Sequence, residues 1–112
     1  MSVDLDRLWR LALNLPEVVE ADHYGRPSFR IGGRILATVP DEHHLNVMVD
    51  EAVARAVADG DPDAVELLWW GQRLAGVRVQ LDAASVALVT ELLDDAWRRR
   101  APARLRRAAT SG

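Results

Sequence analysis

Apolar side chains recur with helical spacing near both ends of the chain. Residues 4–14 carry an apolar stripe at intervals of three and four residues, and Pro16 disfavours helical geometry just beyond it. A second stripe follows Asp82 and continues to about Arg100, before Pro102 interrupts the pattern. The members of the two stripes are Leu5, Leu8, Trp9 and Ala12, and then Val86, Val89, Leu93, Ala96 and Trp97. They predict one amphipathic helix at each end of the chain.

Between these helices the pattern changes to the alternation that is typical of strands. Gly32 and Gly33 separate two apolar runs, and a tight type I′ turn needs positive φ at both of its central positions. The two glycines therefore predict a β-hairpin. Alternation divides its apolar side chains between two faces, with Phe29, Ile31 and Leu36 on one and Ile35, Ala37 and Val39 on the other. The second strand is thus apolar on both faces, and we expect a chain segment, a partner subunit or a ligand to cover its second face.

Three further segments complete the predicted sheet. Residues 44–49 and 77–81 alternate, and residues 65–70 are apolar enough for a strand, with a single helical turn as the alternative. A short helix is predicted over residues 51–59, and residues 16–27 are interpreted as a connector. The resulting order is α-β-β-β-α-β-β-α. It predicts an α+β fold in two layers, with an antiparallel sheet of about five strands and the terminal helices packed on one face.

The length and composition of the chain indicate one globular domain. The chain has 112 residues, of which 49 % are hydrophobic and 28 % charged, an ordinary composition for a soluble domain. We assign residues 1–107 to a single domain and predict a disordered tail over residues 108–112. There is no cysteine, no apolar run approaches the roughly 20 residues of a membrane span, and the start is acidic from Asp4, unlike a signal peptide. We therefore predict a cytoplasmic protein with no membrane partner.

Charge is distributed unevenly along the chain. The formal net charge is −3, but all 17 acidic residues lie at or before Asp95, and six of the 14 basic residues lie from Arg98 onward. Residues 1–97 therefore carry −9 and residues 98–112 carry +6. Blocks of like charge often form interaction tails. The chain has no lysine, so the basic block also has a simpler interpretation, a general preference for arginine codons.

No constellation of residues predicts catalysis or metal binding. His43 and His44 are adjacent on a predicted strand, so their side chains point to opposite faces and are poorly placed to share one ion. His23 has no nucleophile tied to it by spacing, and no glycine-rich loop opens a helix. We predict no catalytic residue, no cofactor and no metal site, and we expect that the protein is not an enzyme.

Trp69 and Trp70 allow two interpretations. In the structural one, alternation buries one ring and leaves the other at the rim of the domain. In the functional one, the rings form a stacking platform for a base or a flat ligand. Arg73 and Arg78 are close enough in sequence to flank such a platform.

The stretch LPEVVEADHYGRPSFRIGGRILAT resembles the signature of the MmcQ/YjbR family. The shared features are Leu15-Pro16 after the first helix, the segment Tyr24-Gly25-Arg26-Pro27-Ser28-Phe29, and Gly33-Arg34 at the next strand. The resemblance covers nearly the whole chain, because Val77 to Asp82 and the terminal helix with Ala96-Trp97 also fit. Two positions depart conservatively from the pattern. Tyr24 stands where the family often has Trp, and Arg34 where it often has Lys.

The resemblance implies a small bacterial protein with a CyaY-like fold, related in shape to frataxin. Such proteins are commonly labelled DNA-binding through a "double wing" of hairpins, and no catalytic residue is carried over. The frataxin likeness suggests iron at acidic helices, but the acidic residues of the first helix and the connector are too sparse here to predict a site. The family motif itself maps to Tyr24, Gly25, Pro27, Phe29 and Gly33.

Two functional hypotheses follow. The first is a nucleic-acid-binding module with DNA as its candidate partner; its candidate residues are Arg26, Arg30, Arg34, Arg73, Arg78, Trp70, Arg98, Arg99 and Arg104. The alternative is a module that binds a protein or a small ligand, as a homo-oligomer or with another protein, and has no role with nucleic acid. The acidic body of the chain opposes the first hypothesis, because it repels a polyanion.

Overall fold

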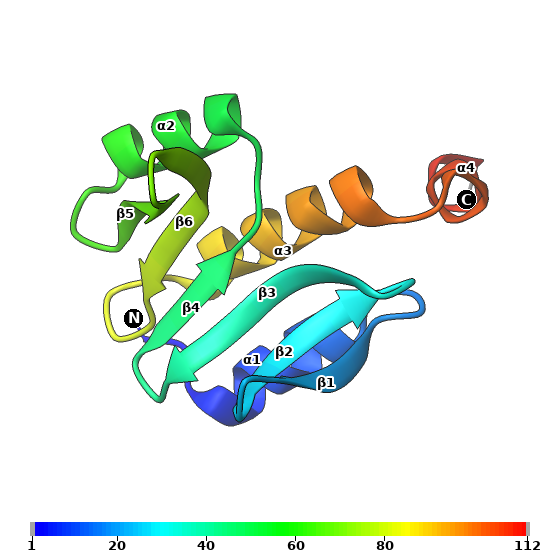
Figure 1. Ribbon diagram of the computed structural model, residues 1–112, viewed down its shortest axis with the longest axis horizontal. Helices are drawn as coiled ribbons and strands as arrows, with labels where there is room; N and C mark the ends of the chain where they lie inside the picture. Colours follow the sequence, from blue (N-terminus) through cyan, green and yellow to red (C-terminus); the bar gives the residue numbers. More distant parts are fainter. Residues whose placement is uncertain (1, 112) are drawn as a thin grey trace.

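A computed structural model describes the backbone of residues 2–111 and the side chains of residues 2–109. Its centre is a six-stranded sheet in the order β1-β2-β3-β4-β6-β5, with every neighbouring pair antiparallel (Figure 1). The strands are β1 (Val19–His23), β2 (Arg26–Ile31), β3 (Arg34–Asp41), β4 (His44–Val47), β5 (Val65–Trp70) and β6 (Arg73–Gln80). The helices are α1 (Leu5–Leu13), α2 (Glu51–Gly60), α3 (Val86–Arg100) and α4 (Ala103–Ser111). The predicted α+β class and two-layer architecture are confirmed.

Side-chain caps start the helices α1, α2 and α3. Asp4, Asp50 and Ser85 each accept a hydrogen bond from the backbone N–H three residues further on, at the start of α1, α2 and α3 respectively. Such a bond satisfies one of the amide donors that the first helical turn leaves unpaired. α1 and α2 therefore begin where the sequence pattern places them, whereas α3 begins after Ser85 and not at Asp82, the residue that the sequence suggests as its cap.

The main core lies between one face of the sheet and the helices. α1 and α3 lie behind the sheet in the view of Figure 1. Trp97 of α3 is 2 % exposed, and its Nε1 donates a hydrogen bond to the carbonyl oxygen of Pro16 at 2.9 Å. This bond ties α3 to the Leu-Pro turn that follows α1. We call the opposite face of the sheet, which α1 and α3 do not cover, the open face.

The sheet has one strand more than the sequence predicts. β1 lies within the segment that we interpreted as a connector, and it pairs only with β2 at the edge of the sheet. Its residues are mostly exposed, and Val19 keeps 57 % of its surface. Because this edge strand buries so little, it carries no apolar alternation, and the pattern predicts about five strands rather than six.

A β-bulge corrects the predicted faces of β3. Phe29 pairs with Ala37 but Arg30 pairs with Ile35, so Leu36 is an extra residue between these two pairs. The bulge brings Leu36 and Ala37 into the main core together, and Val39 joins them. The expectation that Ala37 and Val39 lie on the face opposite to Leu36 is therefore wrong, and of the three expected coverings it is the chain itself that buries them. Only Ile35 keeps its place on the open face.

The diglycine turn and the C-terminal break follow the sequence. Gly32 and Gly33 have φ of 56° and 79° and join β2 to β3, as a two-residue hairpin turn requires. α3 ends at Arg100, ahead of Pro102, and a separate α4 follows. α4 runs into the stretch for which we predict a disordered tail, and Gly112 lies outside the described residues; the boundary at residue 107 stays a prediction. Within residues 2–111, no helix has the length and apolar character that crossing a membrane requires.

Candidate nucleic-acid interface

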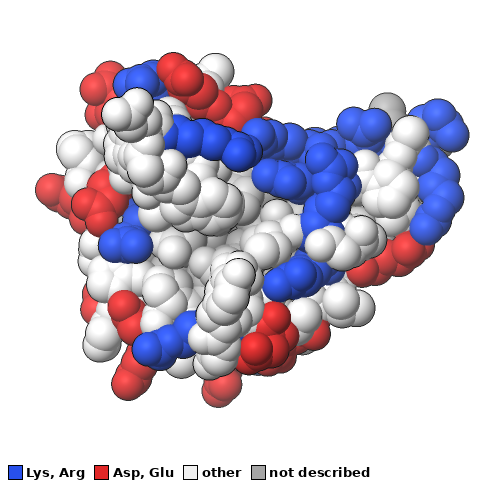
Figure 2. All heavy atoms as spheres, viewed as in Figure 1, with Lys and Arg blue, Asp and Glu red and all other residues white. Residues whose placement is uncertain are grey.

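Four arginines from three separate elements come together beside the open face. Arg34 begins β3, Arg73 begins β6, and Arg99 and Arg100 end α3. Burial lowers the pKa of Arg100, and the positive charges of Arg99, Arg34 and Arg73 lower it further. We call these four residues the arginine cluster. Figure 2 shows blue spheres in a continuous band along the upper and right-hand side of a hollowed, largely white area of this face.

Packing of α3 delivers Arg100 to this position. Ala96 and Trp97 are buried, and Arg100 follows them by four and three residues, so it continues the buried face of the helix. Its Nε is buried and has no hydrogen-bond partner among the residues that the structure describes. In the part of the chain that the structure describes, no ion pair joins Arg34, Arg73 or Arg100 to a carboxylate. The carboxylates of the described residues therefore leave Arg34, Arg73 and Arg100 without an ion pair. The acidic Asp95 interacts electrostatically with Arg99.

A small apolar patch lies on the open face. Ile35 packs against a cluster of Met48, Leu68 and Ala75, which are at most 7 % exposed. Met48 directly follows Val47 at the end of β4, and Leu68 follows Leu67 on β5. Alternation therefore places Met48 and Leu68 on the face opposite to Val47, which belongs to the main core, and to Leu67, which packs against that core. We call Ile35, Met48, Leu68 and Ala75 the apolar floor.

The two tryptophans stand at the end of β5, next to this floor. Trp69 and Trp70 keep 48 % and 49 % of their surface. The interpretation in which alternation buries one ring is therefore wrong. β5 is an edge strand and both residues lie beside the turn at Gly71, so neither ring is enclosed. Trp70 pairs with Arg73 across the strands, and this places a half-exposed ring directly beside the arginine cluster.

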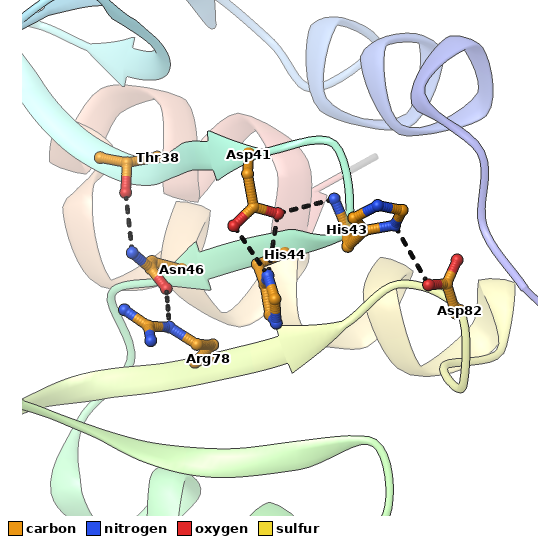
Figure 3. Close-up of polar contacts among 7 residues, drawn as sticks. All are labelled: Thr38, Asp41, His43, His44, Asn46, Arg78 and Asp82. Atoms are coloured by element: carbon orange, nitrogen blue, oxygen red, sulfur yellow. Dashed lines mark hydrogen bonds and ion pairs between the residues drawn. The ribbon is translucent and has the colours of Figure 1, made fainter.

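A row of polar side chains crosses the open face. Ser28 pairs with Thr38, Thr38 with Asn46, and Asn46 with Arg78. Asn46 donates to Thr38 Oγ1 at 3.3 Å and accepts from Arg78 Nε at 3.2 Å, as Figure 3 shows. Arg30 donates through Nε to Ser28 Oγ at 3.2 Å. Arg78 and Arg30 are thus held half-buried against the sheet, outside the arginine cluster.

Besides Arg30 and Arg78, three more of the predicted binding residues lie outside the cluster. Arg98 pairs with Asp94 at 2.9 Å, and Arg104 makes two hydrogen bonds of 2.9 Å to Glu17. Those bonds hold the pKa of Glu17 below its ordinary range. Arg26 is exposed at the start of β2. In the C-terminal block of arginines, Arg98 and Arg104 are thus paired with carboxylates, whereas Arg99 and Arg100 contribute to the cluster.

The family motif has an architectural role in this structure. Tyr24 and Gly25 form the turn between β1 and β2 with positive φ, and Tyr24 is 93 % exposed. Pro27 and Phe29 follow in β2. Phe29 is fully buried, and its ring lies edge to face with that of Trp9, with the two ring centroids 5.1 Å apart. Gly33 completes the second turn. The motif thus defines two successive turns and the core residue between them.

The adjacent histidines have different partners. His43 Nδ1 lies 3.2 Å from Asp82 Oδ2, whereas His44 Nδ1 lies 2.8 Å from Asp41 Oδ1 (Figure 3). Asp41 also accepts a hydrogen bond from the backbone N–H of His43 at 2.8 Å. This backbone bond, followed by that of the His44 ring, holds the pKa of Asp41 below the ordinary value of 3.8. The four side chains brace the turn between β3 and β4.

We expect Asp41→Asn to lower stability at neutral pH and to have little effect in acid. A carboxyl whose pKa is depressed by folding stabilises the fold fully above its unfolded pKa, and that contribution is lost as pH falls through the folded pKa. The difference in urea midpoint between the parent and Asp41→Asn should therefore be constant above about pH 5 and shrink below pH 4. A difference that grows toward low pH would contradict the assignment.

These features define a class of protein: a small α+β domain built on one antiparallel sheet, with helices on one face and an arginine-lined hollow on the other. The chain belongs to the YjbR family, whose family model matches residues 13–99. The match begins at the end of α1 and reaches the last turn of α3, so it includes the whole sheet.

A solved structure shares this fold. The crystal structure of Deinococcus radiodurans protein DR2400, family-model domain DUF419, aligns with a TM-score of 0.75 and 19 % sequence identity, covering 96 % of this chain and 88 % of that chain. At this identity the likeness establishes the fold. No curated protein matches the chain.

Sequence reasoning placed Arg34, Arg73, Arg99 and Trp70 among the binding candidates, and the structure brings these four together. Sequence reasoning included Arg100 only as a member of the basic C-terminal block and did not single it out, and it did not predict the apolar floor. The helical stripe contained the signal for Arg100, since its next position after Ala96 and Trp97 is residue 100. The floor gave no such signal, because it joins residues of β3, β5, β6 and the end of β4 that lie far apart in the sequence.

Proposed function

We propose that this protein is a non-enzymatic nucleic-acid-binding module whose phosphate site is the arginine cluster. The observation that carries the proposal is the convergence of four arginines from three elements, three of them without a carboxylate partner among the described residues. Guanidinium groups bind phosphate oxygens through paired N–H donors, and neutralising phosphates drives association by releasing counterions. The DNA-binding label implied by the family resemblance supports the same proposal.

The acidic composition does not oppose binding at this place. Association depends on the local field at the site more than on the sum over the molecule. In Figure 2 the red spheres lie around the periphery of this face, and the band of arginines beside the hollow is free of them. A polyanion that approaches the open face therefore meets the positive cluster first.

Binding should depend steeply on salt. If the four arginines of the cluster each contact a phosphate, log K should fall with log salt with a slope of roughly −3 to −4. Fluorescence anisotropy of labelled mixed-sequence oligonucleotides at 50 and 200 mM salt measures this slope.

A single substitution shows whether the cluster is responsible. Arg73→Gln should weaken binding about tenfold at 50 mM salt and make the slope shallower by about one. Arg10→Gln is the matched control, since it removes the same charge from α1, behind the sheet. Absence of binding at 50 mM salt, or equal losses in the two variants, would refute the proposal.

A further inference from the structure

The half-exposed tryptophans add a second kind of contact to the arginine cluster. Trp70 pairs with Arg73, a member of the cluster, at the end of the β5–β6 hairpin. Trp70 follows Leu68 of the apolar floor by two residues on β5, and at the register shift between Leu68 and Trp69 the extra residue, Ala75, is on β6, so alternation along β5 keeps Trp70 on the face of Leu68. An aromatic surface and a phosphate-binding charge therefore stand side by side on the open face.

Exposing two large aromatic rings at one edge costs the protein favourable burial. Burial of an aromatic side chain is favourable because it removes a large apolar surface from water. Trp69 and Trp70 keep about half of their surface, 48 % and 49 %, whereas Trp97 of the same chain is 2 % exposed. Aromatic rings of this kind beside a basic groove are the usual means of holding unpaired bases, because every base has a flat face that can stack.

We infer that the open face selects single-stranded nucleic acid, with an unpaired base stacked on Trp70 and the adjoining phosphates on the arginine cluster. This inference rests on the proposed function. In a duplex the bases stack on one another and expose only their edges in the grooves, so no base face is accessible for stacking on Trp70. The duplex then engages the arginines alone and binds more weakly.

Three oligonucleotides of equal length separate the contributions of bases and phosphates. They are a mixed-sequence single strand, its blunt duplex, and the same single strand with abasic positions through its middle; the single strand is made as both DNA and RNA. We expect the intact single strand to bind at least about tenfold more tightly than the duplex or the abasic strand. Binding of the intact single strand should also quench tryptophan fluorescence, whereas the abasic strand should leave this fluorescence unchanged.

Substitution of the ring tests the same contact from the protein side. Trp70→Leu should weaken single-strand binding about 5- to 150-fold and leave duplex binding unchanged, whereas Trp70→Phe should retain most of the affinity. Leu13→Ala is the matched control, because Leu13 is an exposed apolar residue on α1, 43 % exposed. Circular dichroism and the urea midpoint verify that each variant is folded.

The outcomes distinguish the inference from the function on which it rests. Binding that needs Arg73 but is equal for single strand, duplex and abasic strand, and that is indifferent to Trp70→Leu, overturns the inference and leaves the proposed function standing. Failure of all three oligonucleotides to bind in an arginine-dependent way overturns both. Tighter binding of the single strand, abolished in Trp70→Leu, establishes the inference for whichever of DNA or RNA shows it.

Discussion

Gly76→Ala is expected to destabilise the protein by about 3 kcal/mol or more. A Cβ at position 76 would overlap the carbonyl oxygen of Val47 and approach the Cα of Met48 to 3.1 Å. Both are backbone atoms of the neighbouring chain segment, so no side chain can move aside to relieve the overlap. Overpacking of a tight interior costs about 1–3 kcal/mol, and more where the backbone must shift.

The measurement is urea unfolding of the two proteins with a matched glycine substitution. Gly60→Ala is the control, since nothing lies within 4 Å of a Cβ built at Gly60 and its φ is compatible with a side chain. It should leave the free energy of unfolding within about 0.5 kcal/mol of the parent. A Gly76→Ala protein as stable as Gly60→Ala would contradict the close approach of β6 to β4, and with it the shape of the open face.

The variant Arg34→Gln/Arg73→Gln/Arg100→Met is expected to lose nucleic-acid binding and retain or gain stability. Removing one arginine from its phosphate weakens binding by about tenfold at 50 mM salt, so removing three should weaken it by at least about 100-fold. The fold loses nothing comparable, because among the described residues these arginines have no carboxylate partner and the buried Nε of Arg100 has no hydrogen-bond partner.

Stability and binding should therefore change in opposite directions in this variant. Removing an unsatisfied buried donor and the repulsion among like charges should raise the free energy of unfolding by up to about 1 kcal/mol. Anisotropy and urea unfolding on the same preparation measure both quantities. A variant that loses binding because it is unfolded, or one that binds as the parent does, would show that the cluster has another role.

The sequence alone predicts the helices and the central hairpin because local rules decide them. The helical spacing of their apolar residues predicts α1 and α3. Two adjacent glycines, which adopt positive φ, favour a two-residue turn between β2 and β3. Each of these features depends on residues that are neighbours in sequence.

The sequence does not predict the features that depend on pairing between distant strands. β1 forms although Glu20 and Asp22 are exposed, because β2 offers it backbone hydrogen-bonding groups. The bulge at Leu36 sends Ala37 and Val39 to the core, and simple alternation places them on the wrong face. A one-residue irregularity of this kind leaves no trace in the hydrophobic pattern.

The candidate site could be predicted only in part for the same reason. Trp70 and Arg73 belong to one hairpin, and their proximity follows from the short distance between them in sequence. Arg34 and Arg100 come within electrostatic range of each other only because α3 packs on the sheet beside β3. The ion pair between Arg104 and Glu17 likewise depends on how α4 is placed against the rest of the chain, whereas the pair between Arg98 and Asp94 is local, with a spacing of four residues on α3.

The central claim is that nucleic acid binds at the arginine cluster on the open face, and amide chemical shifts followed residue by residue test it most directly. A ¹⁵N-labelled sample titrated with a mixed-sequence single strand should show its largest shift changes at Arg34 and Ile35, from Leu68 to Ala75, and at Arg99 and Arg100. The chemical shifts of the α1 amides, on the opposite side of the sheet, should not change. Shift changes confined to α1 or to residues 104–107, with the cluster unaffected, would contradict the account.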